Sequence, residues 1–519
     1  MRVFDTLKEE MNLGRFDKLR GRGGKADESL DSFGRAVEEY SSGKEVNEEE
    51  DDDGMSKYWT IAAAGAGLFS DGYVNNSVGS VNTLLGTIYG SVYTNSAAAS
   101  NVSSIAFAGT VIGQLLFGYV ADNNSREVGM MVSTAILIAF TILCACAWGT
   151  TPSAMFTALT IYRMFLGIGI GGEYPAGSVA CAEASSILGK GRRNRWFIFF
   201  THTMIDLGCV ISAIVPFIIL CCYGKDNLAP VWRITLGVGA IPPCLLFVLR
   251  LKFKESPRFA KYNMKHTRFP YKLIIRFYGA RLACVSVMWF LYDFSSYAFG
   301  IYFTEILNLL IPDGDLKRTF GWNILLNFFY LPGSLLGAFA ADYIGPRLTC
   351  ITGALLQAII GFVMAACFDQ LRGQIAAFVI IYGLFLTLGE FGPGDQIGIF
   401  CSKSCATPIR GQYYGVAAAV GKIGAYLGTK FFPVIVEHAG GAGTTSGNQM
   451  PFWIASSLCV VTAFLALFYV PSLTQDSMTE EDTQFIQYLK DNGFDTTKLG
   501  NVTPISSTTR LLSSHSAAA

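Results

Sequence analysis

Ten ionisable residues lie inside long apolar stretches of this 519-residue chain, where charges are rare. A charged side chain within a bilayer is costly, and such residues usually face a bundle interior and mark a pathway. We therefore expect most of the ten to line a central cavity and some only to pair with one another. They are Asp71, Arg163, Glu173, Asp206, Asp293, Glu305, Glu390, Asp395, Lys422 and Lys430.

One acid lies in a glycine-rich stretch, Gly171-Gly172-Glu173-Tyr174-Pro175. Apolar surroundings favour the protonated form of a carboxyl group. Glu173 is therefore predicted to take up and release a proton, and Asp71 is a second candidate within the segment 69–76. Pro175 removes a backbone donor and is predicted to distort the helix that carries Glu173.

A second set of residues has the spacing of one helical face. Trp289, Asp293 and Tyr297 are each four positions apart, so their side chains lie above one another on a helix. Such a stripe is usually core, but an acid in its middle favours a binding role. The indole and phenol groups can donate to an anion, whereas Asp293 can do so only when protonated.

A buried lysine at position 422 needs a negative partner, which could be Asp293, Asp395 or a bound phosphate. The Gly-Pro-Gly at 392–394, just before Asp395, interrupts a helix, and a membrane protein tolerates that where backbone lines a cavity. His202 and Asp206 lie four positions apart, which fits either a proton relay or a packing hydrogen bond.

No Ser/His/Asp set and no metal-ligand spacing appears in the sequence. We therefore expect no enzyme activity, no metal and no cofactor, with the proton as the only coupling ion. Hydrophobic residues make up 51% of the chain, charged residues only 15%, and the mean hydropathy is +0.39. Soluble domains carry about 25% charged residues, so a soluble enzyme, a nucleic-acid binder and a disordered protein are excluded.

The apolar stretches are long enough for helices that cross a bilayer, which takes roughly 20 residues. A basic insert separates two sets of six, the layout of two repeated halves. The sequence predicts an all-α membrane protein, with a tail over 1–57, one half over 58–251, a linker over 252–276, a second half over 277–471 and a tail over 472–519. The predicted spans are 58–85, 102–121, 128–149, 154–180, 196–222, 231–251, 277–310, 321–343, 347–368, 374–400, 408–436 and 451–471.

The formal net charge of zero divides unevenly along the chain: −6 over 1–57, +9 over 58–471 and −3 over 472–519. The basic residues gather in alternate connections, so the positive-inside rule places those loops and both tails in the cytoplasm. Asn101, in an Asn-Val-Ser sequence, then lies outside and is a candidate glycan acceptor. We expect both tails to be solvated, and they are candidate targets for ubiquitin or kinase machinery. Lipid is the expected surrounding, and a monomer the expected state.

The two halves repeat one turn motif. Asp122 and Arg126 follow the second span, and Asp342 and Arg347 follow the eighth, with the two acids 220 positions apart. Each motif ends a glycine-rich helix, and its acid can pair with an arginine or cap a neighbouring helix. This resembles the loop motif of the major facilitator superfamily, although Ser125 and Glu127 depart from it. We interpret the four charged residues as conformational latches.

Four motifs together are similar to the phosphate:proton symporter family of that superfamily. They are Gly172-Glu173-Tyr174-Pro175, Trp289-xxx-Asp293-xxx-Tyr297, Phe391-Gly392-Pro393 and Gly421-Lys422-Ile423-Gly424-Ala425. The chain has Glu173 where the family usually has Asp, and Gly394 where it usually has Asn. These departures fit a closer group of proteins. The stretches 70–75 and 410–415 resemble those of the fungal glycerophosphoinositol permeases, whose relatives also carry glycerophosphocholine.

The resemblance implies a proton-coupled importer of glycerophosphodiesters in the plasma membrane. It implies that Lys422, Tyr174, Trp289 and Tyr297 hold the phosphate, and that Glu173, Asp71 or Asp293 carries the proton. We also count Glu173, Asp293 and Asp395 among the substrate-binding residues. Two alternatives remain open: a symporter of inorganic phosphate, and a nutrient receptor that signals with little transport.

Overall fold

A computed structural model describes residues 54–500 except 190, 254, 266, 312–314, 442–443 and 475. The chain divides into two units, Met1–Trp59 and Thr60–Ala519. Of the first unit only the beginning of α4 (Gly54–Gly65) is described. The acidic run 48–53 and the Ser/Thr-rich 502–519, where modification was predicted, lie outside the described residues. The account below concerns the second unit.

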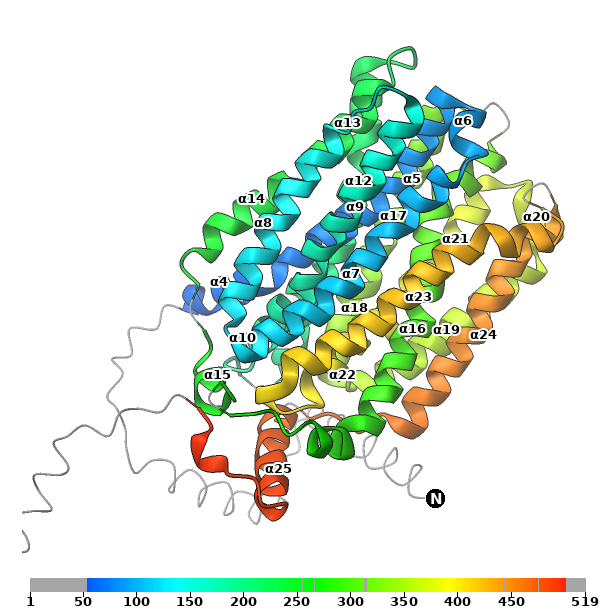
Figure 1. The fold of residues 1–519 in the computed structure, drawn as a ribbon. Coiled ribbons are helices and arrows are strands. Elements are labelled where there is room, and N and C mark those ends of the chain that lie inside the picture. The colour runs from blue at the N-terminus through cyan, green and yellow to red at the C-terminus, as the bar shows by residue number, and fades with distance from the viewer. Residues whose placement is uncertain are drawn as a thin grey trace, which may run out of the picture. The chain divides into compact units, whose positions relative to one another are not determined.

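Eleven helical stretches among the described residues are long and apolar enough to cross a membrane, and they coincide with predicted spans 2 to 12. The six-helix first half contains five of them. Figure 1 shows how its helices are arranged. Its helices are α7 (Ala97–Asn123), α8 (Arg126–Ala145), α9 (Pro152–Gly172) continued by α10 (Val179–Ser185), α11 (Arg193–Phe200) continued by α12 (His202–Tyr223), and α13 (Ala229–Val238) continued by α14 (Ile241–Arg250).

The second half repeats this order after the linker. Its first helix begins at Tyr271, so the last residues of the predicted linker are helical. The helices are α16 (Tyr271–Leu310), α17 (Leu316–Phe328) continued by α18 (Tyr330–Tyr343), α19 (Pro346–Ala366), α21 (Ile375–Gly389) continued by α22 (Asp395–Lys403), α23 (Arg410–His438) and α24 (Thr445–Tyr469).

The first predicted span differs from the others. It forms α4, a short turn (Ala66–Leu68) and α5 (Phe69–Tyr89). Helix α5 buries Asp71, Asn75 and Asn82 besides several serines, so it is too polar to count among the eleven apolar helices. It packs against α12 of its own half and α16 of the other. Polar residues on a central helix fit a lining position rather than a lipid-facing one.

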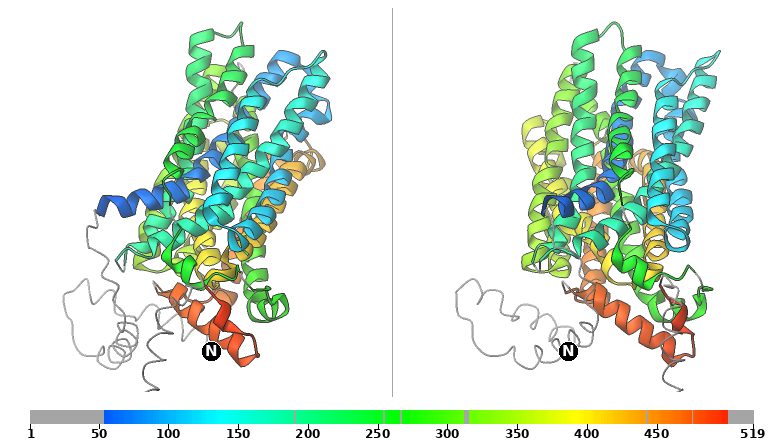
Figure 2. Two further views of the ribbon diagram at one scale, coloured as in Figure 1. Left: turned by 60° about the vertical axis from the view of Figure 1, so that its left-hand side comes forward. Right: turned by 90° about the vertical axis from the view of Figure 1, so that its left-hand side faces the viewer.

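The two halves meet along four pairs of helices: α7 with α23, α5 with α16, α12 with α17, and α11 with α18. In Figure 1, α7 and α23 run side by side although they are far apart in the sequence, and Figure 2 shows the bundle from two further sides. Each half contributes equivalent helices to the contact, which is the arrangement expected of two repeats.

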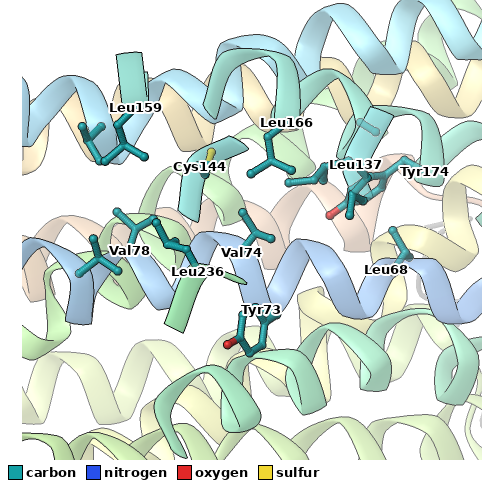
Figure 3. Packing of buried hydrophobic residues seen from close by; sticks show 14 of the residues in the cluster. Leu68, Tyr73, Val74, Val78, Leu137, Cys144, Leu159, Leu166, Tyr174 and Leu236 are labelled. Carbon is teal, nitrogen blue, oxygen red and sulfur yellow. The ribbon is translucent and has the colours of Figure 1, made fainter. Parts of the chain in front are cut away.

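The apolar interior of the first half lies between α5, α8, α9 and α13. Val74, Leu137, Leu166 and Leu236 meet there, with Tyr174 at one end of the cluster (Figure 3). The outward surface, by contrast, exposes many large apolar side chains, among them Leu116 and Ile359, each about half exposed or more. An outer surface this apolar is covered by lipid in a membrane protein.

The fourth and tenth spans both contain a short wide turn of π-helix. These segments are η3 (Glu173–Ser178) and η4 (Glu390–Gly394), and each begins at a glutamate and contains a proline. Gly392 departs from helical geometry, with φ −93° and ψ −107°. The predicted interruption at Gly-Pro-Gly is therefore confirmed, and so is the distortion at Pro175. Such turns occur often at functional sites.

The linker and the second tail contain further helices, α15 (Pro257–Tyr262) and α25 (Ser477–Asp491). The expectation of a solvated second tail is wrong for α25. Phe485 and Leu489 of this helix are fully buried against Tyr278 and Met264. Apolar residues at helical spacing explain the docking, since they give this otherwise polar segment one apolar face.

Candidate functional site

A cavity lies between the two halves and encloses about 860 Å³, including its opening. Its walls come from α5, η3, α11 and α12 of the first half, and from α16, α18, η4/α22 and α23 of the second. The predicted site residues that line it are Asp71, Tyr174, Trp289, Asp293, Tyr297, Asp395 and Lys422.

Lys422 is the central cation of the cavity. Its side chain is 1% exposed, and Nζ lies 3.4 Å from Oδ2 of Asp71 and 3.4 Å from Oδ2 of Asp293. The ammonium also donates to the hydroxyl of Tyr297 and lies over that ring. Two carboxylates around one ammonium leave a net negative charge, so this group is suited to bind a proton or to release the lysine to an anion.

Asp71 holds the hydroxyl groups in place. Its Oδ2 accepts hydrogen bonds from Tyr174 at 2.5 Å and from Tyr297 at 2.7 Å, and its Oδ1 accepts one from Asn75 at 2.7 Å. Asp293, in contrast, makes its contact to Lys422 without a hydrogen bond to Oδ2. With the ammonium of Lys422, Asp71 is thus fixed by four donors, and Asp293 is the less engaged carboxylate.

The face predicted on α16 is present. Trp289 lies against Tyr174 and Tyr414, with ring centres 6.0 and 5.5 Å apart. Asp293 and Tyr297 extend the same wall toward Lys422. Trp289, Tyr174 and Tyr297 therefore surround the lysine with groups that can donate to an anion.

A second polar cluster lies in the same cavity. His202 of α12 pairs with Oε2 of Glu390, whose Oε1 accepts a hydrogen bond from Tyr292 at 2.8 Å. Asp206 and Asp395 line the cavity beside them and are 2% and 1% exposed. The sequence interpretation put His202 with Asp206, but the hydrogen-bond partner of His202 is Glu390. Its partner lies in the other half of the chain, so sequence spacing gave no signal for this contact.

Three of these groups are close enough to surround a small cation. The ligand atoms of His202, Asp206 and Glu390 all lie within 4.8 Å of one another. This geometry is compatible with a cation, although no metal was predicted from the sequence.

Glu173 is not in the cavity. Its Oε1 and Oε2 accept hydrogen bonds from Arg250 at 2.7 and 2.6 Å, and Ser133 and Thr134 complete its shell. The expectation that Glu173 lies beside the substrate is therefore wrong in this structure. The reason is Arg250, which pairs with Glu173. An arginine at the end of the sixth span is expected at the membrane surface, but the side chain of Arg250 is fully buried.

The latch residues act mainly as helix caps across the two halves. Asp122 of α7 accepts from the backbone N–H groups of Gly411 and Gln412, at 2.9 and 2.7 Å, where α23 begins. Asp342 of α18 accepts from the backbone N–H of Asn194, at 3.1 Å, where α11 begins. Each half therefore caps a helix of the other, one of the two roles predicted for these acids.

The two arginines of the motifs differ in their contacts. Arg126 pairs with Glu183 at 2.8 Å and donates to the carbonyl of Thr407. Arg347 donates to the carbonyls of Ala466 and Leu467 at the end of α24. Arg126 thus joins the two halves, whereas Arg347 fastens its loop within the second half.

Asn101, the predicted glycan acceptor, lies in the second turn of α7. Its side chain accepts a hydrogen bond from Lys430 at 2.7 Å. A glycan acceptor is normally an accessible loop residue, so this geometry counts against that prediction. Lys430 in turn lies away from the cavity that contains Lys422.

Comparison with known proteins agrees with the fold. Residues 59–269 and 271–485 match the family described as Sugar (and other) transporter. A proton:xylose symporter bound to a bromodeoxyglucose has the same fold, with a TM-score of 0.67 over 83% of this chain and 99% of its own, at 17% identity. At that identity the likeness concerns the fold alone.

Curated relatives are closer in sequence. A glycerophosphodiester transporter of Candida albicans is 51% identical over 86% of this chain and 84% of its own. A glycerophosphocholine permease of the same organism is 49% identical over 86% and 85%, and its major glycerophosphoinositol permease is 49% identical over 85% and 84%.

The fold and the charged cavity define a multi-pass membrane transporter of the major facilitator type, and not an enzyme. The chain belongs to the Sugar (and other) transporter family, and within it to the group of fungal glycerophosphodiester permeases that the sequence motifs resemble.

Proposed function

We propose that this chain imports glycerophosphodiesters together with protons across the plasma membrane, with both termini in the cytoplasm. The observation that carries the proposal is Lys422 held between Asp71 and Asp293 at 3.4 Å each, inside a cavity shared by the two halves. The names of the relatives and the basic loops on one side of the membrane support the substrate class and the orientation.

Proton binding and phosphate binding are coupled through Lys422 in this proposal. A phosphodiester is an anion, and ionised Asp71 and Asp293 beside it would repel it. Protonation of Asp293, the less engaged carboxylate, removes one negative charge and frees Lys422 for the phosphate. Trp289 then donates its indole N–H to the phosphate oxygens, and Tyr174 and Tyr297 donate their single O–H to them once these hydroxyl groups turn away from Asp71.

Release on the other side follows from alternating access of the two halves. The caps made by Asp122 and Asp342 hold one end of the interface closed until the halves rock apart. A membrane potential, negative inside, opposes entry of an anion by about 2.3 kcal/mol per charge per 100 mV. More than one proton per monoanionic diester is therefore expected.

Uptake in a transport-null cell tests the substrate class. Labelled glycerophosphoinositol, glycerophosphocholine and inorganic phosphate are offered singly and in competition. The proposal expects uptake of at least one diester, with weak competition by phosphate. If only inorganic phosphate enters, the substrate assignment is wrong, and the remaining candidate is a phosphate symporter.

A further inference from the structure

The cavity has a second, carboxylate-rich end beside the Lys422 centre, and it is more acidic than phosphate binding requires. We propose that Asp206, Glu390 and Asp395 bind a cationic head group, so that the substrates bound best are glycerophosphodiesters whose alcohol carries an ammonium group, such as glycerophosphocholine. This inference rests on the proposed function and names the class of diester within it.

The charges are the first observation. The lining of the cavity contains five carboxyl groups but only one lysine and one histidine. Asp71 and Asp293 surround Lys422, so Asp206, Glu390 and Asp395 have only His202 as a basic partner among the described residues. A buried carboxylate without a counter-charge is strongly unfavourable. A substrate that brings its own positive charge removes that cost.

The unsatisfied atoms are the second, independent observation. Asp395 is 1% exposed, and neither of its carboxylate oxygens has a hydrogen-bond partner among the described residues. One oxygen of Asp206, Oδ2, is also without a partner. Buried polar atoms of native proteins are nearly always paired, but these oxygens are themselves buried and have no partner, in two residues that line the cavity. A cationic ligand that moves in beside them would supply the missing partner.

The surroundings suit an organic cation. The aromatic rings of Phe197, Tyr292 and Tyr330 line the same cavity. An ammonium group is attracted to such ring faces, and sites for quaternary ammonium ligands are commonly aromatic cages. Tyr292 is held in place by its hydrogen bond to Glu390.

A missing side chain keeps this end of the cavity open. A Cβ at Gly394 would lie 2.4 Å from Oε2 of Glu390, 2.7 Å from the hydroxyl of Tyr292 and 2.9 Å from Nε2 of His202. Any side chain at this position would therefore push the cluster apart or fill its space. Glycine at position 394 therefore allows Glu390, Tyr292 and His202 to stay in contact and leaves the space beside them free.

The two ends are close enough for one small molecule. Tyr292, which bonds Glu390, and Asp293, which faces Lys422, are consecutive residues of α16. Since both groups also line one cavity, a diester with its phosphate at Lys422 has its head group on the side of the carboxylates in this proposal. In glycerophosphocholine the negative and positive charges are separated by only two carbons and one oxygen, which suits neighbouring sites of opposite sign.

The test compares two substrates that share the phosphodiester and differ in the charge of the head group. Uptake of labelled glycerophosphocholine and glycerophosphoinositol is measured in a transport-null cell for the wild type, Asp395→Asn and the control Glu437→Gln, an exposed acid on α23. Folded protein at the cell surface is quantified for each. We expect Asp395→Asn to raise the KM for glycerophosphocholine by on the order of tenfold, the loss of one charge-assisted contact, and the KM for glycerophosphoinositol by less than about twofold.

The wild type alone gives a result that does not depend on folding of a variant, because it should prefer glycerophosphocholine in direct competition. Equal effects of Asp395→Asn on both substrates, or a wild-type preference for glycerophosphoinositol, would overturn the inference while leaving the proposed function intact. Sodium-dependent uptake that Asp395→Asn abolishes would assign the cluster to an inorganic cation instead and also overturn it. If neither diester enters, the proposed function itself fails.

Discussion

At the scale of single residues, Lys422 is the charge on which the account depends. It is the buried cation nearest to both Asp71 and Asp293, and its neighbours Tyr174 and Tyr297 are hydrogen-bonded to Asp71. The sequence already predicted that Lys422 needs a negative partner, and Asp293 was one of those considered. Asp71 was considered only as a proton carrier, because its distance from Lys422 along the chain, 351 residues, hides the contact.

Replacement of Lys422 by glutamine should abolish uptake. The variant keeps a polar side chain of similar length but removes the positive charge that holds the phosphate. We expect kcat/KM for the diester to fall by at least about a hundredfold, since a buried charge-assisted contact of about 3 kcal/mol is lost. The measurement is initial uptake, normalised to folded protein at the surface.

Lys430→Gln is the matched control, because Lys430 lies on the same helix two turns further on and outside the cavity. It should keep uptake within about twofold of the wild type. Equal losses in both variants would show that positive charge on α23, rather than the position of Lys422, is what matters.

Glu173 and Arg250 form a buried pair, so their expected effect is on folding. Breaking such a pair from one side costs about 3–5 kcal/mol because the other charge is left uncompensated. Glu173→Gln should therefore lower the melting temperature and the amount of folded protein. The double variant Glu173→Gln, Arg250→Met should recover much of both.

A different result would restore the role first predicted for Glu173. If Glu173→Gln folds and melts like the wild type but loses the dependence of uptake on the proton gradient, Glu173 is a proton carrier and the structural interpretation of the pair is wrong. Thermal melting and uptake measured on the same preparation distinguish the two.

At the scale of helices, the sequence predicted the elements well and their contacts poorly. Apolar length placed eleven spans within several residues, because a bilayer imposes that length on each helix separately. The interruption of the helix at 392–394 was also predictable from the sequence, since proline removes a backbone donor. Partners such as Glu390 for His202 and Arg250 for Glu173 depend on how helices pack, and no local pattern encodes this.

Helix α25 was missed for a related reason. Its segment contains Ser, Thr and acidic residues, which resemble those of a solvated tail, and its apolar residues are few. In the structure Asp482 accepts from the backbone N–H of Thr407 at 2.6 Å and pairs with Arg258 at 3.1 Å. Glu481 pairs with Arg281 of α16. The helix therefore joins the linker to the second half.

Asp482→Asn should loosen this attachment. Its carboxylate is 1% exposed and serves a backbone donor, a hydroxyl and an arginine at once. We expect a loss of about 1–3 kcal/mol in the free energy of unfolding, typical for a buried charged hydrogen-bond network, seen as a lower melting temperature of the purified protein.

The control for this prediction is Asp491→Asn at the exposed end of the same helix. It should leave the melting temperature unchanged. If Asp482→Asn melts like Asp491→Asn, α25 is only loosely attached and contributes nothing to stability.

At the scale of the whole molecule, the two repeated halves place equivalent residues in different surroundings. Glu173 and Glu390 occupy equivalent places, each at the start of a π-helical turn and 217 positions apart. One is neutralised inside its own half by Arg250, and the other faces the shared cavity and pairs with His202 across the halves. The substrate site is therefore asymmetric although the fold is not.

The helix caps made by Asp122 and Asp342 are equivalent in the two halves, whereas the residues that line the cavity are not. Each holds the first N–H groups of a helix in the opposite half. A negative side chain at a helix N-terminus is favourable, and opening the interface at these points would expose both caps at once. The two caps thus suit a transporter whose halves move as bodies.

Proton-driven uptake into vesicles tests the central claim most directly. The purified chain is reconstituted in lipid vesicles with an alkaline interior, and uptake of labelled glycerophosphocholine and glycerophosphoinositol is followed with and without a protonophore. The account predicts accumulation above the external concentration that the protonophore collapses and that the Lys422→Gln variant lacks. Equal uptake with and without the proton gradient, stopping at the external concentration, would contradict it.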